Sequence, residues 1–317
     1  MTFLALAGPT ALTAQAAEPT LPDLATRLAG MTAVTGFEQR LVDSLLTLMP
    51  GAVRDRAGNA VVVLGAGERR RLVACPVSEP GFVVGGVRED GWLTLRRAPG
   101  RAPPGADGQL EGQRVTVFGR RGPVPGVIGV RSIHLTRGRG GGGAEFTVDS
   151  AYLDLGAASR AEVAAAGVGV PSPLALAKRP QRYGGDLLAA PVAGRRTACA
   201  ALVIAVRHAM AAQGMVPRGE SVVVAFVVQQ ELLEHGLATV ASMRGPFAET
   251  VLVDGGAGLP GGLVRTADTL GSRRPSLGGV SRWSLGVRYA ATPVETVALG
   301  GADSLRSALA RWIGGGR

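Results

Sequence analysis

Carboxylates follow two apolar segments whose composition predicts buried strands. Gln229, Gln230 and Glu231 follow the run SVVVAFVV, and Asp254 ends the run TVLVD. In α/β folds, functional sites form at the sheet edge where the carboxyl ends of the strands meet. We therefore expect Glu231 and Asp254 to be candidate site residues at one edge. Helix capping or salt bridging explains the two carboxylates equally well from spacing alone.

The chain has three histidines, which is few for a zinc enzyme. His235 lies four residues after Glu231, a helical spacing that suits either a metal site or a surface pair. His208 is expected in the last turn of a helix, where an imidazolium suits the helix dipole, and His134 lies in a turn region. The histidines alone do not predict a metal centre.

Common nucleophile and nucleotide motifs are absent. The sequence contains no G-x-S-x-G, no Walker A loop and no H-E-x-x-H. Gly256, Gly258 and Gly261 spell G-x-G-x-x-G after VLVD, but Pro260 and the following GGLVRT do not begin a helix. We interpret this glycine pattern as a plain loop.

Cys75 and Cys199 both lie in apolar segments, LVACPV and TACAALV. A free cysteine in such surroundings packs as a small hydrophobe. The spacing of the pair matches no metal motif and implies no disulfide framework, while a single bridge between the two cysteines remains open.

Composition indicates a globular chain with a basic surface. Hydrophobic residues make up 46% and charged residues 18% of the 317 positions, and the net charge of +10 is almost wholly arginine because Lys178 is the single lysine. The arginines are scattered along the sequence and do not form the clusters that bind a phosphate backbone. Aromatic residues make up only 4% of the chain, which leaves few side chains on which bases could stack. We expect no nucleic-acid partner; an anionic surface remains compatible with the charge.

The first 17 residues are small and apolar, and Ala14-Gln15-Ala16 resembles a signal-peptidase site. This pattern predicts a signal peptide over 1–17 and a periplasmic or secreted protein. The segment lacks Lys and Arg, so a cytoplasmic protein with an N-terminal tail is the alternative. No other stretch is long and apolar enough to span a membrane.

Hydrophobic periodicity predicts an α/β domain with a β-rich insertion. Helices are expected in LPDLATRLA and FEQRLVDSLLTLM, the second with Leu41, Leu45, Leu46 and Met49 on one face, and at 197–213. Buried strands are expected at 60–64, 71–77, 221–228 and 250–254. Short strands at 82–87, 92–96 and 114–118 follow one another with no helix between them. We therefore assign 18–78 and 181–317 to the α/β domain and 79–180 to the insertion, with 137–143 as its flexible loop.

Several segments resemble the co-catalytic zinc aminopeptidases of the tetrahedral and glutamyl type. They are VTGFE, GNAVVVLG, EPGFVV, GQRVTVFGRRGPVPGVIGVRSIHL, YLDLGAASRAEVAAAGVGV and VRYAATPVET, and the resemblance covers about Leu24 to Trp312. It implies a three-layer aminopeptidase domain with an inserted β-barrel-like, PDZ-like dimerisation domain. It also implies two zinc or cobalt ions and assembly into dimers or twelve-subunit shells.

The family's site residues are mostly replaced. The resemblance places Pro76 and Ser78 where the family has a metal-binding His and a catalytic Asp, and Ala193 where it has the metal-bridging Asp. Gln230 stands at the general-base Glu, and Ala291 at the last His ligand. The metal-ligand positions at Glu231 and Asp254 retain carboxylates, and Arg195 matches a family arginine, followed by the additional Arg196.

These replacements predict a catalytically degenerate member. A two-metal hydrolytic site needs enough donors, a bridging carboxylate and a base, and a glutamine has no basic form near neutral pH. Without metal, Glu231 and Asp254 would repel each other in a partly buried cleft. We hypothesise that one guanidinium, from Arg195 or Arg196, bridges the two acids; protonation of one acid is the alternative.

Three functions remain open on this basis. The first is an exported pseudopeptidase without cofactor that binds peptides or partner proteins, and forms a homo-dimer or larger homo-oligomer. The second is a hydrolase with residual activity through one metal held by Glu231, Asp254 and His235. The third is a structural subunit that assembles with an active paralogue.

Overall fold

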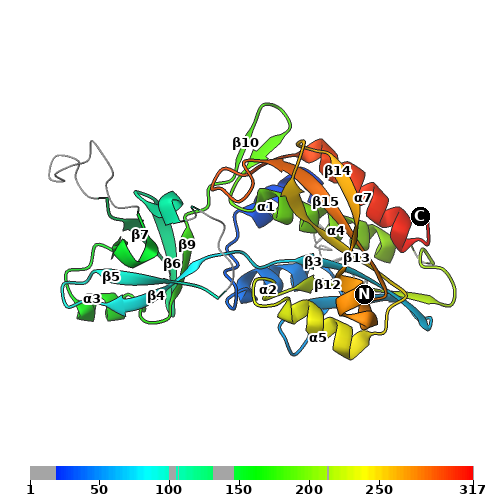
Figure 1. Ribbon diagram of the computed structural model, residues 1–317, viewed down its shortest axis with the longest axis horizontal. Coiled ribbons are helices and arrows are strands. Elements are labelled where there is room, and N and C mark those ends of the chain that lie inside the picture. Colours follow the sequence, from blue (N-terminus) through cyan, green and yellow to red (C-terminus); the bar gives the residue numbers. More distant parts are fainter. Residues whose placement is uncertain (1–18, 100–104, 106, 131–145, 213, 317) are drawn as a thin grey trace, which may run out of the picture.

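The strands build one ten-stranded sheet and one closed six-stranded barrel (Figure 1). The computed structural model describes residues 19–99, 105, 107–130, 146–212 and 214–316. The signal peptide expected over 1–17, the loop at 137–143 and His134 lie outside these residues.

The large sheet has parallel strands at its centre and antiparallel strands toward both edges. Its order is β1-β2-β12-β3-β13-β15-β16-β11-β10, and β14 pairs with β15 off this path. Parallel pairing joins β12 to β3, β3 to β13 and β13 to β15. The strands are β1 Val53–Arg54, β2 Ala60–Gly65, β3 Arg69–Pro76, β10 Gln181–Tyr183, β11 Leu187–Ala189, β12 Glu220–Val227, β13 Glu249–Ala257, β14 Leu263–Asp268, β15 Gly279–Arg288 and β16 Thr296–Ala298.

Helices cover both faces of the sheet. Side chains of α1, α2, α4 and α7 join one core cluster, and those of α5 and α6 join a second cluster on the opposite face. This is why β12, which is apolar at nearly every position, is buried on both faces. The helices are α1 Leu21–Ala29, α2 Gln39–Leu48, α3 Arg160–Ala165, α4 Ala193–Ala211, α5 His235–Arg244, α6 Leu270–Arg273 and α7 Leu299–Ile313.

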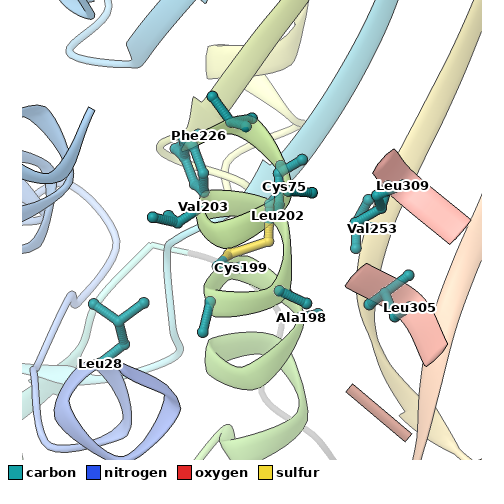
Figure 2. Packing of buried hydrophobic residues seen from close by; sticks show 14 of the residues in the cluster. Leu28, Cys75, Ala198, Cys199, Leu202, Val203, Phe226, Val253, Leu305 and Leu309 are labelled. Atoms are coloured by element: carbon teal, nitrogen blue, oxygen red, sulfur yellow. A yellow bond between two sulfur atoms is a disulfide. The ribbon is translucent and has the colours of Figure 1, made fainter. Parts of the chain in front are cut away.

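The central helix is α4. It packs between α1, α7 and the sheet, and Ala198, Leu202 and Val203 lie within the core (Figure 2). Helix α1 in turn begins where Thr20 accepts a hydrogen bond from the amide of Asp23 and ends at Gly30. These local signals place α1 against α4, so that α4 is covered on most sides.

The barrel is inserted between β3 and β10. Its strands close in the order β4-β5-β8-β7-β6-β9, all antiparallel, around an apolar core that includes Val84, Leu95, Val117 and Leu174. The barrel strands are β4 Phe82–Val87, β5 Leu93–Arg97, β6 Arg114–Gly119, β7 Gly122–Ile128, β8 Leu153–Asp154 and β9 Pro173–Leu176. This domain also contains α3 and two short 3₁₀ helices at Asp107–Leu110 and Val148–Ser150. A further 3₁₀ helix, Pro275–Leu277, belongs to the α/β domain. The expected α/β fold with an inserted barrel is confirmed.

Cys75 and Cys199 form a disulfide that joins β3 to the second turn of α4 (Figure 2). Of the two alternatives that the sequence left open, the structure has the bridge. Both sulfurs are buried in the core cluster beneath the carboxyl end of β3.

Element boundaries differ from the sequence expectation at one functional position. Asp254 does not end its strand, because β13 continues to Ala257. Pairing of β13 with β3 stops at Leu252, whereas pairing with β15 continues through Ala257. Asp254 therefore lies just beyond the point where β13 leaves β3. Among the described residues, no helix combines the length and apolar character needed to cross a bilayer.

The disulfide should stabilise the domain. Replacing both cysteines in a Cys75→Ala and Cys199→Ala variant is expected to lower the free energy of unfolding by about 2–4 kcal/mol, because the bridge closes a long loop. Equilibrium denaturation of variant and wild type measures this difference. Two free thiols by intact mass in the unreduced wild type, or an unchanged denaturation midpoint, would contradict it.

Candidate functional site

Arg195 lies between the two carboxylates that the sequence singled out. Its Nε donates to Asp254 Oδ1 at 2.9 Å and its Nη2 to Asp254 Oδ2 at 3.2 Å, while Nη1 donates to Glu231 Oε1 at 3.0 Å. Nη1 also donates to the backbone carbonyl of Ser78 at 2.5 Å. One guanidinium thus joins α4, β13, the loop after β12 and the end of β3.

Two glycines allow α4 to come this close to β13. A Cβ on Gly194 would lie 2.5 Å from Val287 Cγ1 and 3.0 Å from the Cα of Gly255. A Cβ on Gly255 would lie 2.8 Å from the backbone of Gly194 and Arg195. The helix and the strand therefore touch through their backbones, and this contact brings Arg195 beside Asp254.

The first turn of α4 is electrostatically unusual. It contains Arg195 and Arg196 and no acidic residue, although a helix amino terminus favours negative charge. Glu295, which precedes β16, accepts a hydrogen bond from the amide of Gly194 at 2.9 Å and supplies the missing carboxylate. Its second oxygen accepts from the amide of Ala291, and burial raises the pKa of Glu295.

Arg196 does not reach the two site carboxylates. It is fully buried, and its Nη2 donates to Glu79 Oε2 at 2.9 Å while its Nη1 donates to the carbonyl of Val77 at 2.5 Å. Lys178 Nζ bonds the same Glu79 oxygen and the carbonyl of Met31. Glu79 lies on the segment that leads from the α/β domain into the barrel, and Lys178 lies on the segment that leads back. One buried ion cluster therefore holds the two segments that connect the domains.

The loop after β12 carries Glu231 in a turn. Gln229, Leu233 and Glu234 have positive φ, and α5 begins only at His235. The expectation that Glu231 and His235 lie one turn apart on the same helix is therefore wrong, because Leu233 and Glu234, which lie between them, have left-handed backbone conformations. His235 is exposed, and His208 lies in the last turn of α4 as expected.

Buried groups hold this loop by its backbone. Glu38 accepts a hydrogen bond from the amide of Gln229 at 2.8 Å, and Ser78 Oγ accepts from the amide of Gln230 at 2.8 Å. Burial raises the pKa of Glu38. Ser78, for which the resemblance implies a catalytic Asp, thus anchors the backbone of this loop.

The donor set does not fit the pair of metal ions that the resemblance implies. Pro76 at the end of β3, Ala193 at the start of α4 and Ala291 in the turn after β15 have no side-chain donor atoms. The two carboxylates that remain accept hydrogen bonds from a cation. Across the described ranges, no three His, Cys, Asp or Glu side chains lie close enough together to hold a metal ion. Glu231, Asp254 and His235 therefore do not form the one-metal site that the sequence left open.

A cavity of about 520 Å³ opens beside Arg195, Glu231 and Asp254, between the barrel and the α/β domain. Its size lies within the range of ligand-binding clefts. The barrel contributes Phe82, Leu110 and Leu176, while the α/β domain contributes Val192, Val287 and Pro293, among other residues. The site is therefore the floor of a mostly apolar cavity.

Burial and charge together determine the ionisation of the site cations. Burial alone would lower the pKa of Arg195, but the charges and hydrogen bonds of Asp254 and Glu231 raise it above its ordinary value. Burial lowers the pKa of Lys178 to about 8, against the opposing attraction of Glu79. Glu79 has a lowered pKa, because the charges of Lys178 and Arg196 more than offset its burial.

Sequence reasoning missed the ion cluster of Glu79, Lys178 and Arg196 and the roles of Glu38 and Glu295. Two features of the sequence could have pointed to these residues, because Glu38 and Glu79 lie in VTGFE and EPGFVV, two of the segments that carry the family resemblance. A single lysine in an arginine-rich chain was a third signal.

Removing the bridging cation should destabilise the fold. The variant Arg195→Met is expected to lose about 3 kcal/mol, since two partly buried carboxylates are left without their partner. Denaturant unfolding at pH 7 measures the loss. Adding Asp254→Asn and Glu231→Gln to the variant should recover most of it, and a single variant as stable as wild type would contradict the bridging role.

The single lysine permits a direct measurement of its ionisation. Lysine labelled with ¹³C at Cε should give one resonance that titrates near pH 8 in the folded chain. Because the unfolded chain binds this proton up to about pH 10.4, the free energy of unfolding should rise between pH 8 and that value. Titration at the ordinary lysine pKa would contradict the burial of Nζ beside Arg196 and Glu79.

Known proteins resemble this chain in sequence and in fold. SgcX of Escherichia coli K12, named for an inferred aminopeptidase activity, is 30% identical over 182 residues, covering 54% of this chain and 46% of SgcX. Lysyl aminopeptidase of Pyrococcus furiosus is 28% identical over 127 residues, covering 40% and 36%. The chain thus matches less than half the length of these relatives. The TET1 peptidase of Pyrococcus horikoshii, which can assemble into a tetrahedron or a large octahedral shell, superposes with a TM-score of 0.80 at 20% identity, over 93% of this chain and 99% of that chain.

The family assignment rests on a longer match than either relative provides. The sequence profile of the M42 glutamyl aminopeptidases matches residues 58–257, which include β2 through β13, the whole barrel and the Arg195 site. The chain belongs to the M42 glutamyl aminopeptidase family.

Proposed function

We propose that this protein is a catalytically degenerate M42 aminopeptidase homologue that binds peptide segments, of a free peptide or of a partner protein, without hydrolysing them. The observation that carries the proposal is the hydrogen bonding of the Arg195 guanidinium to both Asp254 and Glu231. A guanidinium stays protonated and cannot activate water as a bound metal ion does.

The replaced side chains support the same proposal. Hydrolysis by two metal ions needs a general base that accepts a proton from the attacking water, and the amide of Gln230 cannot accept that proton near neutral pH. Three ligand positions hold Pro76, Ala193 and Ala291. The cavity and the motifs around it are retained, which favours continued binding over loss of all function.

Export and self-association are parts of the proposal. The Cys75–Cys199 disulfide supports an oxidising compartment such as the periplasm or the exterior, because disulfides persist there. The assembly of the TET1 peptidase into closed shells supports a homo-oligomer here. We propose that no zinc or cobalt is retained at the site.

Metal content and turnover test the proposal together. The protein purified with zinc or cobalt present should hold substoichiometric metal by elemental analysis, and should release no chromophore from a panel of aminoacyl anilides. One equivalent or more of metal together with chelator-sensitive turnover would overturn it.

A restored variant serves as the matched control. Pro76→His, Ser78→Asp, Ala193→Asp, Gln230→Glu and Ala291→His together return the family's site residues to the chain. This variant should bind metal where the wild type does not, which shows that the assay detects a competent site. A wild type that binds as much metal as the restored variant would contradict the degenerate assignment.

A further inference from the structure

A second cavity, of about 470 Å³, lies between the two domains and shares no lining residue with the cavity beside Arg195. The α/β domain contributes residues of the segment 32–40, which leads into α2, and the barrel contributes the end of β6 and residues of the segment 167–173 before β9. Helix α2 lies at the side of the α/β domain that faces the barrel (Figure 1). We call this second cavity the Arg40 cavity, and its volume lies within the range of ligand-binding clefts.

The wall of the Arg40 cavity is largely apolar. Phe37 and Phe118 line it and are only half-buried, and Val170 is 61% exposed. Val34 and Pro173 also line the cavity and are buried. A ligand that covers the exposed part of this apolar surface removes it from water, which favours binding.

Contacts within the barrel fix the shape of one side of the cavity. A Cβ on Gly119 would lie 2.8 Å from the carbonyl oxygen of Gly167, so the end of β6 and the loop before β9 touch through their backbones. The amide of Arg120 donates to the carbonyl of Gly167 at 2.9 Å. Within the loop, Ser172 Oγ accepts a hydrogen bond from the amide of Gly169 at 3.1 Å. This side of the cavity is therefore held in place without a ligand.

The charge of the Arg40 cavity is entirely positive. Of the described residues that line it, Arg40 and Arg120 are the charged ones, and none is acidic. Both side chains are exposed, and within the described ranges neither guanidinium forms an ion pair with a carboxylate. The guanidinium carbon of Arg40 lies 5.7 Å from the ring centroid of Phe118, a cation–π contact that does not occupy its N–H donors.

The nearest acid in the sequence does not neutralise Arg40. Glu38 is 2% exposed, and its carboxylate accepts a hydrogen bond from the amide of Gln229. The Arg40 cavity therefore presents two guanidiniums without an opposing acid. Because a guanidinium pairs with a carboxylate through two parallel hydrogen bonds, charge complementarity selects a ligand that carries carboxylates.

We propose that the Arg40 cavity binds an acidic peptide segment in which carboxylates flank apolar side chains. The carboxylates pair with Arg40 and Arg120, and the apolar side chains pack against Phe37, Phe118 and Val170. This binding site goes beyond the proposed function and does not depend on it.

The cavity beside Arg195 does not attract such a segment. There, Asp254 and Glu231 share a single guanidinium, so the floor of that cavity keeps a net negative charge. Like charges repel, and an acidic peptide is therefore directed to the Arg40 cavity.

Three peptides test the proposal. Ac-Gly-Glu-Leu-Phe-Asp-Gly-NH₂ and Ac-Gly-Gln-Leu-Phe-Asn-Gly-NH₂ have nearly the same shape and differ in charge, and titration calorimetry with the full chain at pH 7 gives both dissociation constants. The titrations are made at low ionic strength, because salt screens exposed charges. The acidic peptide should bind at least about tenfold more tightly than its amide counterpart. Ac-Gly-Glu-Ser-Ser-Asp-Gly-NH₂ keeps the charges without the apolar side chains and should bind at least about fivefold more weakly than the first peptide.

Paired variants locate the site. Arg40→Gln together with Arg120→Gln should bring the affinities of the acidic peptide and its amide counterpart within about twofold of each other. Arg218→Gln together with Arg311→Gln is the matched control, since it lowers the net charge equally. Arg218 precedes β12, and Arg311 lies in the last turn of α7, whose end lies far from the barrel (Figure 1). All four side chains are exposed, so both variants should fold, and the control should keep the wild-type preference.

Two peptide results would overturn the proposal. One is equal affinity of the wild type for the acidic peptide and its amide counterpart. The other is a control variant that loses the preference as fully as the Arg40 and Arg120 variant, which would assign the binding to net charge. Phosphatidylglycerol vesicles that bind the wild type and not the Arg40 and Arg120 variant, without any peptide binding, would assign the cavity to a lipid surface and also overturn the proposal.

Discussion

Charge balance at the first turn of α4 is the constraint on which the site depends. Two adjacent arginines at a helix amino terminus oppose the helix dipole, so this turn is stable only where carboxylates surround it. Asp254, Glu231, Glu79 and Glu295 come from four different parts of the chain and meet there. The glycine contact between α4 and β13, the disulfide and the backbone anchors of the loop after β12 all bring these parts together.

A guanidinium can replace the cross-linking role of a metal centre and none of its reactivity. Arg195 ties α4 to β13, to the end of β3 and to the loop after β12 through directed hydrogen bonds. A metal ion also exchanges ligands and acidifies bound water, which requires open coordination and donors that can leave. In the proposed function, the hydrogen bonds of Arg195 therefore keep the segments around the former aminopeptidase site together, and these bonds leave no position open for a reacting water.

The sequence predicted more of the fold than of the site. Local patterns were sufficient for the helix α1 and for the apolar strands β3 and β12. The resemblance to the aminopeptidases, which places Glu231 and Asp254 at metal-ligand positions, led to the hypothesis that Arg195 or Arg196 bridges them. Local patterns could not show that β13 runs past Asp254, because that depends on its pairing with β15. Lys178 and Glu79 were missed because they are 99 residues apart and meet only where both chain crossings of the barrel converge.

The burial of Lys178 has a consequence for the outside of the molecule. Lys178, the only side chain with an amine, is sequestered with Glu79, and the other 33 of the 34 lysine and arginine residues are arginines. Arginine keeps its proton to beyond about pH 12, whereas a lysine-rich surface begins to discharge about two units earlier. The outer face of this protein therefore holds its positive charge through the alkaline range, and reagents that acylate amines find no side chain on it to modify.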